Sequence, residues 1–218
     1  NPISNEFIDL FDGQMHLNEQ VIHCVGDALE RFREDTLRPF RLFRFVAQLG
    51  MNVDESVLIA LPQLLDGIVL PSIDRIRYEM DRLLMGDYWL DALNLMNEQG
   101  WLSLIGLTIP SEALVVDAQP LICRWAWLLS GCRDLSVAKQ LGFSKKDIRY
   151  MSDLIQWDFD GSKLEITAHD LAISSQALMA RGYEGVALGN IQSKLLDKVR
   201  RGEVVNTVDD ICGWLDGL

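Results

Sequence analysis

Apolar residues recur at intervals of three and four positions along most of this chain, which is the period of amphipathic helices. From this pattern we predict helices at residues 27–34, 36–49, 54–66, 71–85, 88–99, 120–131, 134–140, 144–157, 167–180, 186–201 and 207–215. Residues 7–11 instead read as a strand or extended edge, before a turn at Asp12 and Gly13. The sequence therefore predicts an all-α, multi-helix protein.

Polar residues and glycines mark where the predicted helices begin and end. Predicted N-caps are Asp54, Ser72, Ser144, Thr167 and Thr207, and predicted ends are Gly50, Gly86, Gly100, Gly142 and Gly202. Residues 107–119 and 158–162 are predicted breaks between groups of helices. Tryptophans such as Trp125 and Trp214 fall at apolar helical positions, so we expect them to pack in the core.

The composition is that of a globular protein with an acidic surface. The chain has 218 residues, of which 49% are hydrophobic and 24% charged, and its formal net charge is −12. A chain of this size can bury a substantial core. The negative charge argues against a protein that coats nucleic acid indiscriminately, although a local basic surface can still bind RNA.

The cysteines and histidines do not form a metal-binding pattern. Cys24, Cys123, Cys132 and Cys212 are widely spaced, and His16, His23 and His169 add no zinc-site spacing. We therefore expect free thiols in a reducing compartment and no metal ligands in this chain. We also expect a cytoplasmic protein without a membrane span. Asn1 stands where a complete chain would carry methionine, which indicates a fragment of a longer polypeptide.

An acidic pair followed by arginines is the candidate for chemistry. Glu34 and Asp35 precede Arg38, Arg41 and Arg44, which we expect on one face of a helix opposite an apolar stripe. Carboxylates beside guanidinium groups can offer acceptors and donors to the edge of a planar base. The alternative is structural, with Asp35 as an N-cap and Glu34 and Arg38 as a solvated pair.

The chain resembles the class II tRNA nucleotidyltransferase and bacterial poly(A) polymerase family. The similarity rests on Glu34-Asp35-x-x-Arg38, the linker-like segment 8–17, Asp74-Arg75 with Glu79, and the segments 166–171 and 202–207. The resemblance implies the end of a nucleotidyltransferase head at 1–20, a neck at 21–106, a helical body at 107–157 and an RNA-binding tail at 158–218. The head remnant would be α/β and the rest helical.

The resemblance also implies roles for particular residues. Asp35 and Arg38 would meet the base of incoming CTP or ATP, Glu34 would orient Arg38, and Arg41 would lie beside the nucleotide. Residues with a structural role would be Asp9, Gly13, Arg75 and Glu79. On spacing alone, Arg75 and Glu79 are expected as a surface pair worth about 0.3–0.5 kcal/mol, with the role of tying the base-reading helix to the next one.

Catalytic carboxylates are expected elsewhere. Family members bind Mg²⁺ through an Asp-x-Asp motif in the head, upstream of the base-reading motif, and no segment before Glu34 matches it. We therefore predict no catalytic or metal-binding residue in this chain and a missing head, in cis or as a separate chain. Thr36 and Pro39 also depart from the family pattern, and Pro39 favours a helix that begins later.

Two basic clusters are candidates for RNA contact. Lys194, Lys198 and Arg201 are predicted on one face of a helix that follows a glycine-rich turn, and the resemblance favours tRNA contacts there. An ordinary amphipathic helix explains the same pattern. The second cluster, Lys145, Lys146 and Arg149, is open to the same two interpretations.

The sequence thus predicts the nucleotide-selecting and tRNA-binding part of an enzyme that adds C and A to tRNA 3′ ends without a nucleic-acid template. Its substrates would be ATP, CTP and tRNA. A poly(A) polymerase, or a CC-adding or A-adding enzyme of the same family, is equally compatible with these motifs. A non-catalytic helical RNA-binding module is the alternative from another class.

Overall fold

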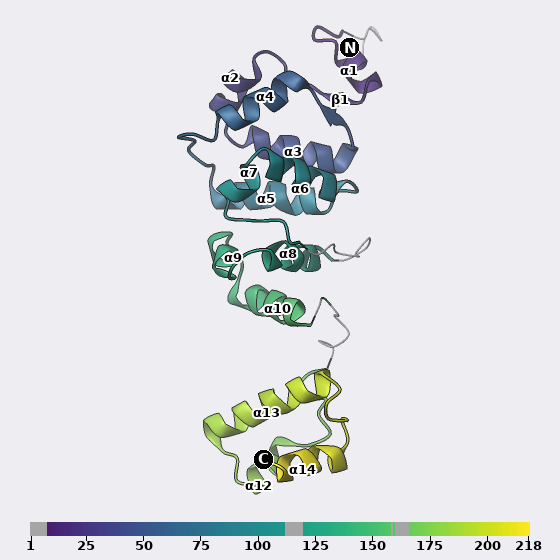
Figure 1. Ribbon diagram of the computed structural model, residues 1–218, viewed down its shortest axis with the longest axis vertical. Coiled ribbons are helices and arrows are strands. Elements are labelled where there is room, and N and C mark those ends of the chain that lie inside the picture. The colour runs from purple at the N-terminus through teal and green to yellow at the C-terminus, as the bar shows by residue number, and fades with distance from the viewer. Residues whose placement is uncertain (1–7, 112–119, 158, 160–165) are drawn as a thin grey trace. The chain divides into compact units, whose positions relative to one another are not determined.

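The computed structural model describes residues 8–111, 120–157, 159 and 166–218, and this part of the chain is mainly helical (Figure 1). It divides into two compact units, residues 1–152 and residues 153–218. The all-α prediction is confirmed. The strands observed within the described residues are β1 (Val21–Ile22) and β2 (Asn52–Val53), which pair in parallel.

The elements of the first unit are α1 (Gly13–Asn18), β1, α2 (Ala28–Glu34), α3 (Arg38–Leu49), β2, α4 (Glu55–Gln63), α5 (Ile73–Leu84), α6 (Trp89–Glu98), α7 (Trp101–Leu104), α8 (Leu121–Ser130) and α9 (Ser136–Gln140). Helix α10 (Lys145–Gln156) begins in this unit and ends in the second. The second unit contains α12 (Ser175–Ala180), α13 (Gly185–Arg200) and α14 (Val208–Asp216).

Helix α3 is the centre of the first unit and packs mainly against α5 and α6. Phe40 and Phe43 of α3 are fully buried. Trp101 of α7 meets the Phe40 ring edge-on, with 5.5 Å between ring centroids, and its indole N–H donates to the carbonyl of Leu61 at 3.2 Å. The helix that carries Arg38 and Arg41 is therefore held in the core through Phe40 and Phe43.

The turn between α5 and α6 contacts α3 through backbone atoms. The N–H of Tyr88 donates to the carbonyl of Ala47 at 2.8 Å. A β-carbon on Gly86 would lie 2.3 Å from that same oxygen, so only glycine fits this approach. The glycine predicted from the sequence as a helix end thus has a second reason, which is the tight packing of α3 against the turn.

Helix α3 begins at Arg38, two residues after the predicted start, because Pro39 occupies one of its first two positions. A proline there lacks an N–H that would in any case have no partner within the helix. Helix α2 begins, as expected, beside Asp27, whose carboxylate accepts from the N–H of Glu30 at 2.8 Å. The turn between α2 and α3 therefore holds Asp35 and Thr36 outside both helices.

The strand predicted at residues 7–11 is wrong for the described residues 8–11, and Phe7 lies outside them. The carboxylate of Asp9 accepts from the N–H groups of Gly13 at 2.9 Å and Gln14 at 2.8 Å, and α1 follows. Side-chain bonds of this kind compete with strand pairing. The same bonds hold the pKa of Asp9 below its ordinary value. Asp9 and Gly13 are thus joined in one local cap.

The predicted caps divide into two groups. Asp54, Ser144 and Thr207 accept from the backbone N–H two or three residues ahead, as predicted. Ser72 precedes α5 but its side chain makes no capping bond. Thr167 is wrong as a helix start, because its own N–H donates to Asp170 and the helix expected at 167–180 begins at Ser175.

Helices α8 to α10 extend the first unit through aromatic and charged contacts. The indole N–H of Trp125 donates to Asp81 of α5 at 2.6 Å, and Trp89 meets Trp127 edge-on at 5.3 Å. Trp125 is 1% exposed, which confirms the predicted core position. Parts of the predicted breaks, residues 112–119 and 158 with 160–162, lie outside the described residues.

The second unit has its own small core. Its buried apolar residues are Leu171, Ile173, Leu178, Ile191, Leu195, Val199, Val204, Ile211 and Leu215, with Trp214 packed at the edge. The segment before α12 is fixed by Asn206, which accepts from the N–H of Ala172 at 2.8 Å and donates to the carbonyl of Asp170 at 2.7 Å. These bonds replace the helical bonds predicted there.

Candidate functional site

One face of α3 lines a hollow of about 280 Å³ in the first unit. Arg38, Arg41 and Phe45, spaced by three and four residues, face it together with Leu42. The remaining walls are Ile22, His23, Cys24, Phe32 and Val57. Two guanidinium groups thus stand at the edge of a mainly apolar hollow, which suits a flat polar ring with apolar faces.

Arg38 is held in place by its neighbours in α2. Its guanidinium donates to the carboxylate of Glu34 at 3.3 Å and to the carbonyl of Arg31 at 3.1 Å. Arg31 also donates to Glu34, at 3.0 Å. These groups are well exposed, so the pairs add little to stability. Their effect is to fix the orientation of the Arg38 guanidinium group. Orienting Arg38 is the role that the resemblance implied for Glu34.

Asp35 does not line the hollow. Its carboxylate accepts from the N–H of Leu37 at 3.1 Å and lies 3.7 Å from the guanidinium of Arg75. The side chain keeps 33% of its surface exposed. The structure therefore places Arg38 and Arg41 at the hollow with Glu34 against Arg38, whereas Asp35 lies outside the hollow and faces Arg75 of α5.

The predicted arginine face of α3 is wrong at Arg44. This residue is buried, and its Nε lies 2.7 Å from a carboxylate oxygen of Glu79 in α5. Its guanidinium also donates to Gln48 at 3.2 Å. Helical geometry explains the outcome, since position 44 lies a full turn from Phe40 and shares its inward direction.

The surface pair predicted between Arg75 and Glu79 is also wrong, because each of the two side chains pairs with a residue outside α5. Glu79 is 6% exposed and pairs with Arg44, whereas Arg75 faces Asp35. Arg75 therefore joins α5 to the turn before α3, and Glu79 joins α5 to α3 itself. Each side chain thus pairs with a residue from another segment, and not with the residue four positions away on α5.

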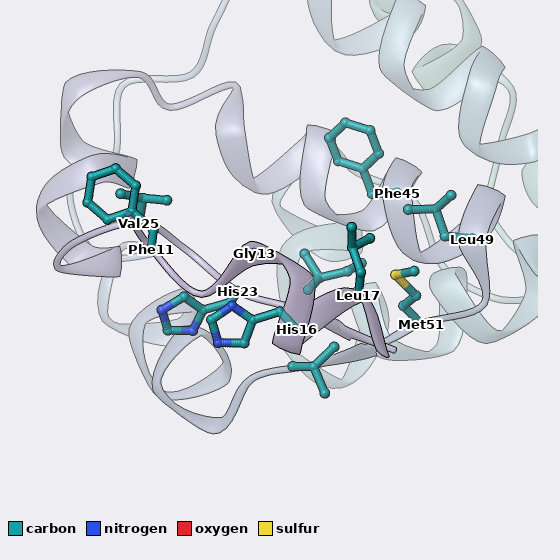
Figure 2. A pocket seen from close by; sticks show the side chains of 11 residues that line it. Phe11, Gly13, His16, Leu17, His23, Val25, Phe45, Leu49 and Met51 are labelled. Carbon is teal, nitrogen blue, oxygen red and sulfur yellow. The ribbon is translucent and has the colours of Figure 1, made fainter. Parts of the chain in front are cut away.

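A second hollow, of about 360 Å³, adjoins the first and shares Ile22, His23 and Phe45 with it (Figure 2). Its lining is mostly apolar and includes Phe11 and Leu17, both largely exposed. Within it the rings of His16 and His23 stack, with 4.3 Å between centroids and 15° between planes. The segment containing α1 and β1 thus presents an exposed apolar surface beside the arginine-lined hollow.

Asp54 links β2 to α4 and to the histidine pair. Its carboxylate accepts from the N–H of Ser56 at 2.9 Å and lies 3.5 Å from Nδ1 of His23. Bonds from the Ser56 side chain and backbone, and then from His23, hold the pKa of Asp54 below its ordinary value of 3.8. The folded protein therefore favours the charged form of this carboxyl group.

The variant Asp54→Ala is expected to lower stability at neutral pH by about 1 kcal/mol, because α4 loses its cap. A group with a lowered folded pKa stabilises the protein above the unfolded value of 3.8, and this contribution disappears as the pH falls through the folded value. Thermal unfolding should therefore show a difference between wild type and variant that shrinks below about pH 4. A Gln63→Ala control at the other end of α4 removes no carboxylate and should not show this dependence. An unchanged difference at low pH would contradict the assignment.

Cys24 is the thiol that lines the first hollow. Burial raises its pKa above the ordinary value of 9.0, while the nearby guanidinium groups of Arg38 and Arg31 act in the opposite direction. The thiol is partly exposed. It therefore reports on occupancy of the hollow without being an activated nucleophile.

The predicted RNA-contacting face of α13 carries acidic partners. Lys198 pairs with Glu203, and Arg201 donates to Asp197 at 3.2 Å. Lys194 is exposed on the same face. The cluster Lys145, Lys146 and Arg149 is exposed at the start of α10. The basic residues have the helical spacing that the sequence predicted. The positive electrostatic field of the α13 face is nevertheless weaker than its cations alone would produce, because the acidic partners partly cancel it.

The described residues do not fit a resident metal ion. Within residues 8–111, 120–157, 159 and 166–218, no group of three or more histidine, cysteine, aspartate or glutamate side chains could hold one. The Mg²⁺ that the family resemblance implies has no ligand set in this part of the chain. Among the described helices, none is long and apolar enough to cross a membrane.

Comparison with known proteins finds a family model and relatives that match parts of this chain. Residues 50–105 match a family model described as the probable RNA- and SrmB-binding site of polymerase A. The CCA-adding enzyme of Leuconostoc mesenteroides is 36% identical over 132 residues, which are 57% of this chain and 33% of that protein. The enzyme of the same name from Bacillus cytotoxicus is 29% identical over 238 residues, covering 97% of this chain and 59% of that protein.

A solved structure shares the fold. The CCA-adding enzyme of Bacillus stearothermophilus, solved in complex with CTP, matches 96% of this chain and 68% of that chain, with a TM-score of 0.61 and 24% identity. The chain spans between a third and three fifths of the two curated relatives above.

These matches are to proteins named CCA-adding enzymes, and the chain shares the helical fold of part of one of them. The chain is thus similar to part of the CCA-adding enzymes, and residues 50–105 also match the polymerase A family model.

Several residues of the candidate site were not found by sequence reasoning. Phe45, Cys24, His23 and Val57 line the hollow but were not singled out from the sequence. Phe45 had a usable signal, because it follows Arg38 and Arg41 at helical spacing. His23 and Cys24 lie just after β1, and no pattern along the chain indicates that they approach α3.

Proposed function

We propose that this chain is the nucleotide-selecting and RNA-binding part of an enzyme that adds C and A to the 3′ ends of tRNA without a nucleic-acid template. The observation that supports this most directly is the hollow beside α3, with Arg38 oriented by Glu34 and Arg41 on the same wall. The catalytic head, with Mg²⁺ bound by its carboxylates, would lie outside this chain. The enzyme would act in the cytoplasm on ATP, CTP and tRNA.

The chemistry of the two bases supports selection by this site. Cytosine and adenine each carry an exocyclic amine that donates and a neighbouring ring nitrogen that accepts. The guanidinium group of Arg38 can donate to the ring acceptors. The carboxylate of Asp35 lies outside the hollow, so it would have to turn toward the base to accept from the amine. Phe32, Leu42 and Phe45 would contact the apolar faces of the ring. Guanine and uracil present the opposite pattern at this edge and would be rejected.

The domain organisation proposed for the chain follows from the same family. Residues 1–20 would end the head, residues 21–106 would form the neck with the base-reading motif, residues 107–157 the body, and residues 158–218 an RNA-binding tail. Lys194, Lys198 and Arg201 would contact the tRNA backbone from the tail. Glu203 and Asp197 would then have to share these cations with phosphate.

Nucleotide incorporation tests the proposal. The longest native polypeptide that contains this sequence would receive tRNAs ending before, within and after CCA, with CTP and ATP supplied singly and together. Ordered addition of C, C and A that then stops supports the proposal. Continued addition of A alone would identify a poly(A) polymerase, the second candidate, which the polymerase A family model favours. Binding of tRNA without incorporation would indicate a non-catalytic RNA-binding module.

Occupancy of the hollow can be measured in this chain alone. CTP is expected to slow the reaction of Cys24 with a maleimide several-fold, because the nucleotide base would cover the thiol. Peptide mapping would follow each cysteine separately. Cys212, which lies in α14, serves as the internal control and should react at the same rate with and without CTP. Equal rates for Cys24 in both conditions would place the nucleotide elsewhere.

A further inference from the structure

The outward face of α5 carries a stripe of exposed side chains that the candidate site does not use. Arg75, Tyr78, Arg82 and Met85 are spaced by three, four and three residues, so they lie in one row along the helix. Tyr78 is 56% exposed and Met85 is 55% exposed. Isolated exposed apolar residues are common, but an aromatic ring between two arginines on one row is a more specific arrangement.

The tyrosine and the second arginine are held together. The guanidinium of Arg82 donates to the Tyr78 hydroxyl at 2.6 Å, and its central carbon lies 5.4 Å from the ring centroid. The contact restricts the rotation of both side chains and leaves the ring more than half exposed. A ring fixed at the surface in this way can stack on a planar group with little further loss of side-chain entropy.

The local charge differs in sign from that of the whole chain, which is −12. Two acidic residues of α5 are committed to other contacts: Glu79 is buried against Arg44, and Asp81 accepts from Trp125 and lies 3.8 Å from Arg77. Asp74 remains exposed beside Arg75 at the start of the helix. Toward Tyr78 and Arg82 the stripe is therefore cationic.

The stripe begins beside the turn that leads into the candidate nucleotide site. Arg75 lies 3.7 Å from Asp35, in the turn that also positions Arg38. An RNA whose 3′ end lies beside a nucleotide in the hollow could therefore continue past Arg75 and along α5. The family model that matches residues 50–105, described as an RNA-binding region of polymerase A, includes the whole of α5.

We propose that the row Arg75, Tyr78, Arg82 and Met85 on α5 binds single-stranded RNA, with a base stacked on Tyr78 and a phosphate paired with Arg82. This inference rests on the proposed function, for which the RNA would be the 3′ end that receives nucleotides. Stacking on an aromatic ring accepts every base, and a guanidinium group pairs with any phosphate. The site would therefore hold RNA without reading its sequence, and selection would remain at the hollow.

Equilibrium binding of a fluorescent, unstructured RNA oligonucleotide to the 218-residue chain tests this inference. Tyr78→Ala is expected to weaken binding about tenfold, the size of one lost base–aromatic stack. Tyr78→Phe keeps the ring and should bind within about twofold of wild type. Arg82→Ala should weaken binding several-fold and reduce the salt dependence by about one phosphate contact. Arg133→Ala, which removes an exposed arginine outside the row, is the matched control.

The outcomes separate this inference from the proposed function. If Tyr78→Ala bound RNA with wild-type affinity, the stacking role would be overturned, even if CTP still protected Cys24. The same holds if Tyr78→Phe lost as much RNA affinity as Tyr78→Ala. Loss of RNA affinity in Tyr78→Ala with an unchanged thermal unfolding midpoint would support it, even if no nucleotide bound. An equal loss in Arg133→Ala would show a diffuse charge effect and would also overturn it.

Discussion

The Glu79→Ala variant is expected to lose about 3–5 kcal/mol of stability, because Arg44 would keep its charge in the core without a carboxylate partner. Both side chains are nearly buried, with 11% and 7% of their surfaces exposed, and they stand 2.7 Å apart. Chemical denaturation followed by circular dichroism would measure the change. The unfolding transition of the first unit should move to clearly lower denaturant concentration.

Two controls distinguish the buried pair from a general effect of α5. Arg75→Ala removes an exposed partner of Asp35 and should change stability by less than about 1 kcal/mol. The double variant Arg44→Met with Glu79→Leu replaces both charges by apolar groups and should recover much of the lost stability. A double variant as unstable as Glu79→Ala would show that packing volume, and not the unpaired charge, causes the loss.

The Arg38→Ala variant of a polypeptide that includes a catalytic head is expected to lower incorporation of CTP and ATP by about ten- to hundredfold, the effect of losing one two-pronged base contact. Binding of tRNA should remain nearly intact, because Arg38 contributes to the nucleotide hollow and not to the proposed RNA surfaces. Asp35→Ala should act in the same direction. Single-turnover incorporation and filter binding would measure the two properties separately.

The control for this variant is Arg33→Ala, which removes an exposed arginine of α2 that does not line the hollow. Arg38→Lys tests geometry, since it keeps the charge but loses the planar fork. The incorporation rate of Arg38→Lys should be closer to that of Arg38→Ala than to that of wild type. Normal nucleotide choice combined with lost tRNA binding in Arg38→Ala would falsify the proposed role of this residue.

Much of the fold follows from local rules in the sequence. The helical period and caps such as Asp54 and Thr207 depend on residues a few positions apart, so they could be predicted without the structure. The errors occurred where a side chain bonded to the backbone, as at Asp9, or where a segment was fixed by a residue far along the chain. Asn206 fixes residues 170–172 in this way, and the predicted helix start at Thr167 could not anticipate it.

The candidate site was predictable only along α3. Glu34 ends α2 and Arg38 begins α3, so their contact joins residues only four positions apart in the sequence. The burial of Arg44 depends on Glu79, which is thirty-five positions further along and on another helix. The walls supplied by His23 and Cys24 depend on the pairing of β1 with β2, two strands too short to leave a pattern. Contacts between distant segments therefore decide which arginine faces the hollow and which faces the core.

The packing of α3 has a consequence for the genetics of this protein. The same helix presents Arg38 and Arg41 to the hollow and Ala47 to the turn at Gly86, so a small rotation of the helix would move both faces together. Selections for altered nucleotide preference should therefore return substitutions around Gly86 and in the core beneath α3, as well as in the hollow. Suppressors of such mutants should arise on α5 and α6, the helices that pack against α3.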